Sequence, residues 1–270
     1  MDNTTASHGV TDHGDVLARM LDNVPLEGFE RSFKMSKGSL LGERYLLGIR
    51  KSDIAPEVLS DICERIGMPP GQHAALRENL PRASTVHFGF ERDDVSGTYK
   101  VYLEFAVTCD GPARKPGDTV LLHLAYKWDV GDPRVATVAR YLYHPDLSAR
   151  QLKLRQAALC PDAAGGTALD ATQRIIDMAL RRTNAPLMYL EVSEEDNPRR
   201  SYDINLHDAG LRIEDIEVPL AQLQQLYAIP GAEFDPLFNQ IRGRRLGHLS
   251  GGVNRHGRDF VTLYYDAEPP

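Results

Sequence analysis

The chain has 270 residues, of which 42% are apolar and 26% charged, enough to bury one large hydrophobic core or two modest ones. The 38 acidic side chains outnumber the 31 basic ones, and the resulting net charge of -7 argues against a nucleic-acid partner. No stretch approaches the roughly 20 apolar residues that a membrane-spanning helix needs, and the polar amino terminus lacks the apolar core of a signal peptide, so we expect a cytoplasmic protein that does not enter a membrane.

The three cysteines, Cys63, Cys109 and Cys160, are odd in number and far apart in the sequence. They form no CxxC motif and no close pair with a histidine, so the sequence predicts neither a disulfide framework nor a structural zinc site. We expect all three to be packing residues.

The amino-terminal half of the chain alternates predicted helices with predicted hairpins. Residues 1–11 lack periodicity, and we expect them to form a disordered tail. From Val16 to Leu21, apolar residues recur at helical spacing before Pro25. The elements expected next are a hairpin of strands 29–35 and 43–49, helices over 52–67 and 72–80, a hairpin of strands 85–91 and 98–107, and a hairpin of strands 119–128 and 135–143.

The carboxyl-terminal half repeats the same alternation. Its expected elements are helices over 148–159 and 169–182, a hairpin of strands 187–194 and 200–207, helices over 213–228 and 232–242, and a hairpin of strands 244–250 and 258–265. Pro219 is expected to kink or interrupt the third of these helices.

Five antiparallel hairpins, three of them followed by helix pairs, favour one closed sheet whose outer face is covered by helices. An open sheet of about ten strands would tend to curl or split, because its edges and one face stay uncovered. The sequence therefore predicts a closed antiparallel barrel of the α+β class, built as one domain over residues 12–270. The alternative is two consecutive α+β domains divided near residues 161–166.

The alternation within the strands predicts which side chains face the inside of such a barrel. In 98–107 the odd positions from Tyr99 to Val107 are apolar or aromatic, and most even positions are polar. Since helices need the apolar face, the polar row of each strand is expected to point into the lumen. The predicted inner row comprises Thr85, His87, Gly89, Glu91, Thr98, Lys100, Tyr102, Glu104, His123, Lys127, Tyr189, Glu191, Ser193, Ser201, Asp203, Asn205 and His207. So many ionisable groups indicate a wet binding cavity, whereas in an open sheet they would form a solvated face.

The order of elements and strands such as YKVYLEF, from Tyr99 to Phe105, resemble the αββα-barrel (ABBA) fold of the aromatic prenyltransferases. The resemblance implies ten antiparallel strands around a solvent-filled chamber, with paired helices outside, over residues 29–266. It also implies that the Lys-x-Tyr strand grips a diphosphate. The sequence departs from that family because it has no helix pair over residues 109–118 and few predicted lumen cations.

Given this resemblance, Lys100 and Tyr102 are expected to bind an allylic diphosphate, as a point charge and a phenol that shields a developing carbocation. Lys127 and Arg140 would add charge, provided that Arg140 shares the inward phase of its strand. A carboxylate, Glu91 or Glu104, would polarise the acceptor. The same carboxylates are alternatively salt-bridge partners of Lys100.

A polar strand and four histidines are the remaining candidate site residues. RRSYDINLHDAG, from Arg199 to Gly210, is unusually polar, and its residues Asp203, Asn205 and His207, with Tyr189 of the preceding strand, are expected to set substrate specificity. Four histidines are further candidates for an acid/base set or a metal site with nearby carboxylates: His87, His123, His207 and His248. No HExxH or similar spacing supports a metal, and no nucleotide-loop or nucleophile-elbow motif is present, so we predict neither a metal nor a cofactor.

These observations favour a small-molecule enzyme that acts on a polar aromatic substrate, with an allylic diphosphate as the second substrate. The alternatives are a non-catalytic metabolite-binding or accessory protein that uses the same lumen, and an acid/base enzyme that uses the histidines. The sequence makes no prediction of the oligomeric state.

Overall fold

The computed structural model describes residues 13–92, 96–107, 117–160 and 168–268. The expected tail over 1–11, the possible domain division near 161–166, Cys109 and most of the segment 109–118 therefore lie outside the described residues. Within the described ranges, no helix is long and apolar enough to cross a membrane.

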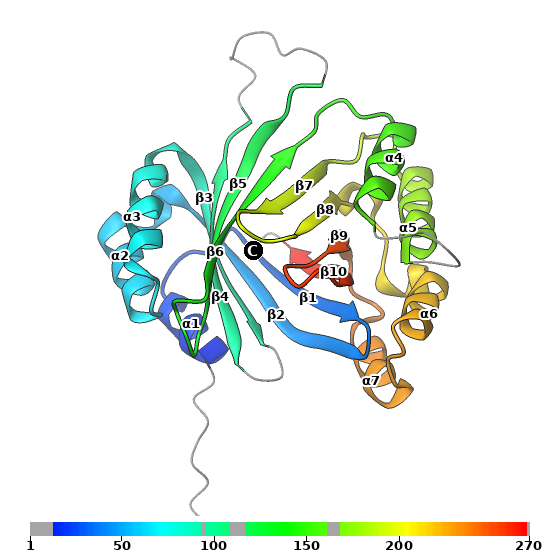
Figure 1. Cartoon of the computed structure of the whole chain (residues 1–270), viewed down its shortest axis with the longest axis horizontal. Coiled ribbons are helices and arrows are strands. Elements are labelled where there is room, and N and C mark those ends of the chain that lie inside the picture. Colours follow the sequence, from blue (N-terminus) through cyan, green and yellow to red (C-terminus); the bar gives the residue numbers. More distant parts are fainter. Residues whose placement is uncertain (1–12, 93–95, 108–116, 161–167, 269–270) are drawn as a thin grey trace, which may run out of the picture.

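Ten antiparallel strands close into one barrel, which confirms the predicted architecture and excludes two separate sheets (Figure 1). Around the barrel the order is β1-β10-β9-β8-β7-β6-β5-β4-β3-β2, so that the first strand pairs with the last. The strands are β1 (Gly28–Ser36), β2 (Ser39–Arg50), β3 (Ala83–Arg92), β4 (Gly97–Phe105), β5 (Val120–Asp129), β6 (Ala136–Tyr143), β7 (Tyr189–Glu194), β8 (Arg200–Asn205), β9 (Leu246–Val253) and β10 (Asp259–Glu268). Closure leaves no unpaired strand edge among them.

Helices cover the outside of the barrel in two groups, seen on opposite sides in Figure 1. The first group is α1 (His13–Leu21), α2 (Pro56–Arg65) and α3 (Pro70–Asn79), and the second is α4 (Ala149–Leu159), α5 (Ala168–Arg182), α6 (Glu217–Leu226) and α7 (Gly231–Ile241). Each group buries its apolar stripe against the apolar outer row of neighbouring strands, which produces two large hydrophobic clusters outside the lumen. Cys63 is fully buried in the first cluster, as expected of a packing residue.

The helix predicted over 52–67 is divided into the 3-10 helix η1 (Lys51–Asp53) and α2. Two further predicted elements differ from the structure for local reasons. The strand predicted over 200–207 ends at Asn205, because the chain turns into the short 3-10 helix η3 (His207–Ala209), which the left-handed Gly210 terminates. The helix predicted over 213–228 is divided into the 3-10 helix η4 (Ile213–Ile216) and α6. Pro219 lies in the first turn of α6, where backbone N–H groups have no intrahelical partner in any case.

Strand register determines which side chains point inward. Lys100 pairs with Lys127, Tyr102 with Ala125, and Glu104 with His123, and paired residues share one face of a sheet. The inner row predicted for β3, β4 and β5 is therefore correct. On β7 the inner row is instead Leu190, Val192 and Glu194, because Ala139 of the inner row of β6 pairs with Glu194.

Candidate functional site

The first group of polar lumen residues lies at one end of the barrel and encloses a cavity of about 320 Å³. We call it the cationic chamber, defined by Lys34, Arg44, Lys100, Lys127, Arg199 and Arg255 together with Tyr102, Tyr141 and Tyr264. Its six cations come from strands β1, β2, β4 and β5 and from the turns beside β8 and β9. Among the described residues they pair with two carboxylates, so this part of the chamber carries a surplus of positive charge.

Glu91 is the first of these carboxylates and contacts three cations. It accepts a hydrogen bond from Lys100 Nζ and lies 3.4 Å from Arg44 Nη2 and 3.6 Å from Lys34 Nζ. Burial alone would raise the pKa of Glu91, but the positive charges of Arg44, Lys100 and Lys34 hold this pKa well below its usual value. Burial lowers the pKa of Lys100 to about 8, although the negative charge of Glu91 acts in the opposite direction and raises it.

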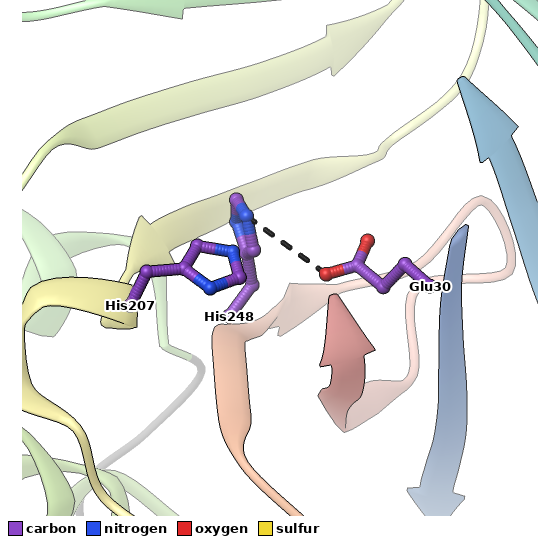
Figure 2. A group of neighbouring side chains, drawn as sticks. All are labelled: Glu30, His207 and His248. Carbon is purple, nitrogen blue, oxygen red and sulfur yellow. Dashed lines mark ion pairs between the residues drawn. The ribbon is translucent and has the colours of Figure 1, made fainter. Parts of the chain in front are cut away.

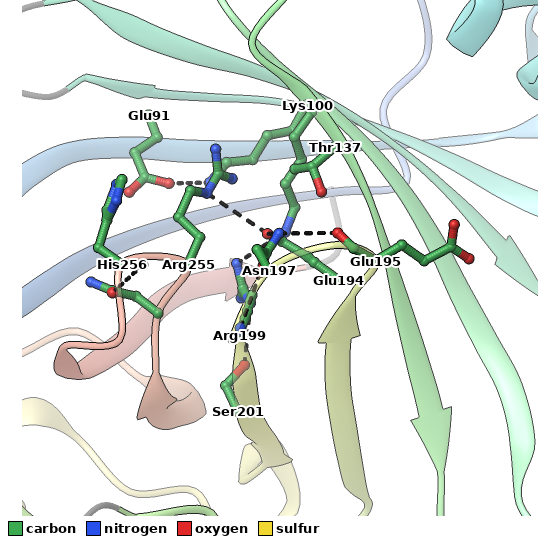
Figure 3. Close-up of polar contacts among 12 residues, drawn as sticks. Glu91, Lys100, Thr137, Glu194, Glu195, Asn197, Arg199, Ser201, Arg255 and His256 are labelled. Atoms are coloured by element: carbon green, nitrogen blue, oxygen red, sulfur yellow. Dashed lines mark hydrogen bonds and ion pairs between the residues drawn. The ribbon is translucent and has the colours of Figure 1, made fainter.

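Glu194 is the second carboxylate, and its side chain is fully buried. Lys127 Nζ lies 3.0 Å from Glu194 Oε1. Arg199 Nη1 lies 3.0 Å from the same oxygen, and Arg255 Nε lies 3.7 Å from Oε2 (Figure 3). Burial alone would raise the pKa of Glu194, but Lys127, Arg199 and Arg255 lower it to about 2. The carboxylate therefore stays ionised and holds three cations at the lumen wall.

Three tyrosines line the same chamber beside the cations. The ring centroids of Tyr102 and Tyr141 are 5.7 Å apart, and Lys127 Nζ lies 5.8 Å from the centre of the Tyr141 ring. Burial raises the pKa of Tyr102, Tyr141 and Tyr264, so all three remain neutral phenols. Neutral electron-rich rings stabilise a nearby carbocation through the negative potential of their faces.

The four candidate histidines lie together at the other end of the lumen, beside a cavity of about 600 Å³. We call this end the histidine pocket, defined by Glu30, His87, Glu104, His123, Asp203, His207 and His248. His87 Nε2 lies 2.7 Å and His123 Nε2 3.6 Å from Glu104 Oε2. The rings of His207 and His248 are 5.0 Å apart between centroids, and His248 Nδ1 lies 2.8 Å from Asp203 Oδ1.

Glu30 lies on β1 beside His248, with 3.9 Å between Oε1 and His248 Nε2 (Figure 2). Burial raises the pKa of Glu30 to about 7. Burial lowers the pKa of His248, but Glu30 and Asp203 outweigh it and raise the value to about 9. The pocket therefore brings acidic and basic groups together in a partly desolvated space.

Comparisons with known proteins decide the fold family. Neither a family model nor a curated protein matches the sequence. The structure of 6-dimethylallyltryptophan synthase from Micromonospora olivasterospora in complex with DMASPP and Trp matches with a TM-score of 0.57 and 17% identity, over 90% of this chain and 84% of that one. 5-Dimethylallyltryptophan synthase from Streptomyces coelicolor matches with a TM-score of 0.59 and 15% identity, over 89% and 81%. The apo form of the prenyltransferase PriB matches with a TM-score of 0.56 and 14% identity, over 90% and 82%.

This chain has the αββα-barrel fold of the aromatic prenyltransferases. The resemblance inferred from element order and from the strand Tyr99 to Phe105 is thereby confirmed. At 14–17% identity the likeness establishes the fold alone, so the function of this αββα barrel rests on its own residues.

The αββα barrel brings most of the predicted site residues into its lumen. Lys100, Tyr102, Lys127 and Glu91 lie in the cationic chamber. At the other end, the histidine pocket contains Glu104, Asp203 and His207, and Asn205 accepts a hydrogen bond of 3.0 Å from the backbone N–H of His207.

Two predicted site residues lie outside the lumen. Arg140 pairs in register with Leu124 of the outer row, and its Nε lies 3.5 Å from Glu195 Oε1 on the barrel's outer face. Tyr189 is fully buried in the cluster between the sheet and the helices, and Glu191 shares its outer row. The prediction that Tyr189 and Glu191 of β7 face the lumen is therefore wrong. Arg140 does not face the lumen either.

The expectation of few lumen cations is also wrong, because the chamber has four further cations, Lys34, Arg44, Arg199 and Arg255. Lys34 and Arg44 belong to polar rows of the first hairpin, which are not part of the predicted inner row. Arg199 and Arg255 lie in turns beside β8 and β9, where strand alternation carries no information. Glu194, which pairs with Arg199 and Arg255, is the last residue of β7.

Proposed function

We propose that this αββα barrel transfers a prenyl group from an allylic diphosphate to an aromatic acceptor inside its lumen. The observation that carries this proposal is the cationic chamber, where, in the part of the chain that the structure describes, six cations are paired with two carboxylates beside three tyrosines. An enclosed surplus of positive charge favours a polyanion such as diphosphate. Among the structures with this fold, one was solved with DMASPP and Trp and another, NotF, with brevianamide F and DMSPP.

The proposed reaction begins with cleavage of the bond between the allylic carbon and diphosphate, whose oxygen keeps the electron pair. Lys100, Lys127 and Arg199 stabilise the leaving diphosphate, because they place positive charge where negative charge develops. Tyr102, together with the other chamber tyrosines, shields the allylic cation from water. The aromatic acceptor then forms the new carbon–carbon bond and releases a proton to solvent.

The acceptor is proposed to lie between the cationic chamber and the histidine pocket. Glu104 is the better placed of the two carboxylates expected to polarise it, because Glu104 follows Tyr102 on the inner row of β4 toward that pocket. Glu91 forms ion pairs with three cations and serves as their counter-ion. Asp203, Asn205 and His207 remain the proposed specificity residues.

The direct test is incubation with dimethylallyl or geranyl diphosphate and a panel of phenols and indoles, followed by mass spectrometry and by calorimetric titration with each diphosphate. A prenylated product supports the proposal. The absence of both product and diphosphate binding contradicts it. Tight binding of both ligands without turnover identifies a metabolite-binding protein instead, which is the alternative inferred from the sequence.

Lys100→Met should lower the affinity for dimethylallyl diphosphate about 10–100-fold, because one charge-assisted hydrogen bond contributes about 1.5–3 kcal/mol. Glu91 keeps Arg44 and Lys34 as partners in this variant, so the chamber should stay folded. Isothermal titration calorimetry measures the change. The matched control is Lys153→Met, which removes an ion-paired lysine from the outer helix α4. Equal affinities of the two variants would contradict the assignment of Lys100.

Affinity for the diphosphate should fall as the pH rises through about 8. Lys100, whose pKa is lowered to about 8 by burial, is charged below that pH and neutral above it, and only the charged amine attracts the anion. The groups that face it are Glu91, Arg44, Lys34 and Lys127. Titrations between pH 7 and 9 measure the effect. Lys100→Arg should weaken this pH dependence, since a guanidinium stays protonated throughout, and an unchanged profile in that variant would exclude Lys100 as its source.

A further inference from the structure

Three potential metal ligands from separate elements meet in the histidine pocket: Glu30 from β1, His207 from η3 and His248 from β9 (Figure 2). One ligand atom from each lies within 4.8 Å of the other two. Ligands of one tetrahedral zinc ion lie about 3.3 Å apart, given bond lengths of about 2.0–2.1 Å. Small side-chain rotations therefore suffice to bring the three atoms onto one ion.

Of the three ligand atoms, Glu30 Oε1 would be stabilised most by a bound ion. It is buried and has no hydrogen-bond partner among the described residues. The 3.9 Å that separate it from His248 Nε2 exceed a hydrogen bond, and a small side-chain shift would bring the two atoms to the roughly 3.3 Å between two ligands of one zinc ion. A buried carboxylate oxygen without a partner is unfavourable, and a bound cation would satisfy it.

Residues around the three ligands fix their orientation. Asp203 Oδ1 lies 2.8 Å from His248 Nδ1, which holds the ring with Nε2 toward Glu30. A carboxylate behind a metal-binding imidazole is the usual outer partner in zinc sites, where it sets the tautomer and orientation of the ring. Asn205 fixes the backbone of His207 through a hydrogen bond of 3.0 Å.

Gly247 provides the room in which these ligands meet. A Cβ atom at this position would lie 2.8 Å from His207 Cε1 and 3.1 Å from Glu30 Oε1. The side chains of His207 and Glu30 thus both lie close to the backbone of Gly247 on β9, next to His248. Any larger residue would push the carboxylate and the imidazole apart.

A second cluster, His87, Glu104 and His123, has ligand atoms at similar mutual distances. Its carboxylate, however, already lies 2.7 Å from His87 Nε2 and 3.6 Å from His123 Nε2 through one oxygen. This cluster is satisfied by its own contacts, whereas the Glu30 group is not. Of the two clusters, the Glu30 group is therefore the better candidate for a metal site.

We propose that Glu30, His207 and His248 bind one divalent transition-metal ion, Zn²⁺ being the best match to two imidazoles and a carboxylate. Three protein ligands leave coordination positions open toward the cavity of about 600 Å³. An oxygen or nitrogen donor of a small molecule in that cavity would complete the coordination. The site lies at the opposite end of the lumen from the cationic chamber and does not depend on the proposed transfer reaction.

The test is a titration of the whole protein, without an affinity tag and stripped with a chelator, with Co²⁺ followed by visible absorption and with Zn²⁺ followed by calorimetry. We expect one equivalent of each ion to bind. His207→Gln and His248→Gln should each abolish this binding, as should the isosteric Glu30→Gln, and Asp203→Asn should weaken it about 10–100-fold. Because no diphosphate is present, the result is independent of the proposed function.

Two controls separate this site from other histidines. His123→Gln removes a member of the second cluster, and His256→Gln removes an exposed histidine of the turn between β9 and β10. Both should bind one equivalent like the wild-type protein. Circular dichroism establishes that each variant is folded, and Zn²⁺ should raise Tm in the wild type and the controls alone. Any of three results would overturn the proposal. These are no stoichiometric binding by the wild-type protein, binding that persists in the double variant of His207 and His248, and loss of binding in His123→Gln.

Discussion

Glu194→Gln should lower the free energy of unfolding by about 3–5 kcal/mol, the range for removing one partner of a buried ion pair. The Glu194 side chain is fully buried, and its partners Lys127 and Arg199 are 3% and 17% exposed. Glutamine keeps the shape but leaves these cations without a counter-charge in a space with little water. Urea denaturation followed by circular dichroism measures the loss.

The neighbouring residue provides the matched control for this prediction. Glu195 is 71% exposed, and its ion pair with Arg140 spans 3.5 Å between Oε1 and Nε. An exposed pair of this kind contributes about 0–1 kcal/mol, so Glu195→Gln should hardly change the unfolding midpoint. If the two variants were equally stable, the cations of the chamber would not depend on Glu194, and the account of the chamber's electrostatics would fail.

The two carboxylates explain how the barrel keeps six cations at one end of its lumen. Lysines and arginines in a confined space repel one another, which destabilises the folded state. Glu91 and Glu194 each hold three of them, which fixes their positions but neutralises only part of the charge. A bound polyanion would neutralise the remainder, so the same feature that limits stability favours the proposed ligand.

The fold was predictable because local patterns determine both its elements and their closure. On β4, buried and partly exposed residues alternate without interruption from Gly97 to Phe105. Such a strand has one possible phase, and its neighbours follow from register. Hairpins joined by short turns then place consecutive strands side by side, and closure removes the two remaining edges.

The candidate site was only partly predictable, because it depends on contacts between distant parts of the chain. Glu30 meets His248 only because β1 closes the barrel against β10, which in turn pairs with β9. Arg199 and Arg255 come from turns, where no periodicity indicates direction. Neither kind of neighbourhood is encoded in the spacing of residues along one strand.

Phase was ambiguous where a strand is apolar on both faces. On β6, Val138 and Leu142 lie on one face and Ala139 and Tyr141 on the other, so hydrophobicity does not distinguish them. The register of β6 with β5, where Lys127 pairs with Thr137, decides the matter and places Arg140 outside. On β7 the alternation indicates the wrong face, because the polar Glu191 lies on the outer row with Tyr189 whereas the apolar Leu190 and Val192 lie on the inner row.

Tyr189→Ala should therefore reduce the free energy of unfolding by about 3–5 kcal/mol, as expected when a large buried ring is replaced by a methyl group. Tyr189 is fully buried beneath α4 and α5, among residues such as Leu152 and Ile176, and its ring centroid lies 5.8 Å from that of His144. Urea denaturation measures the loss. Tyr189→Phe keeps this packing and removes only a hydroxyl that lies 3.5 Å from Glu191 Oε1, so it should leave the affinity for dimethylallyl diphosphate unchanged. Weaker diphosphate binding by folded Tyr189→Phe would show that β7 presents its other face to the lumen, and the inner row derived from its register would have to be reassigned.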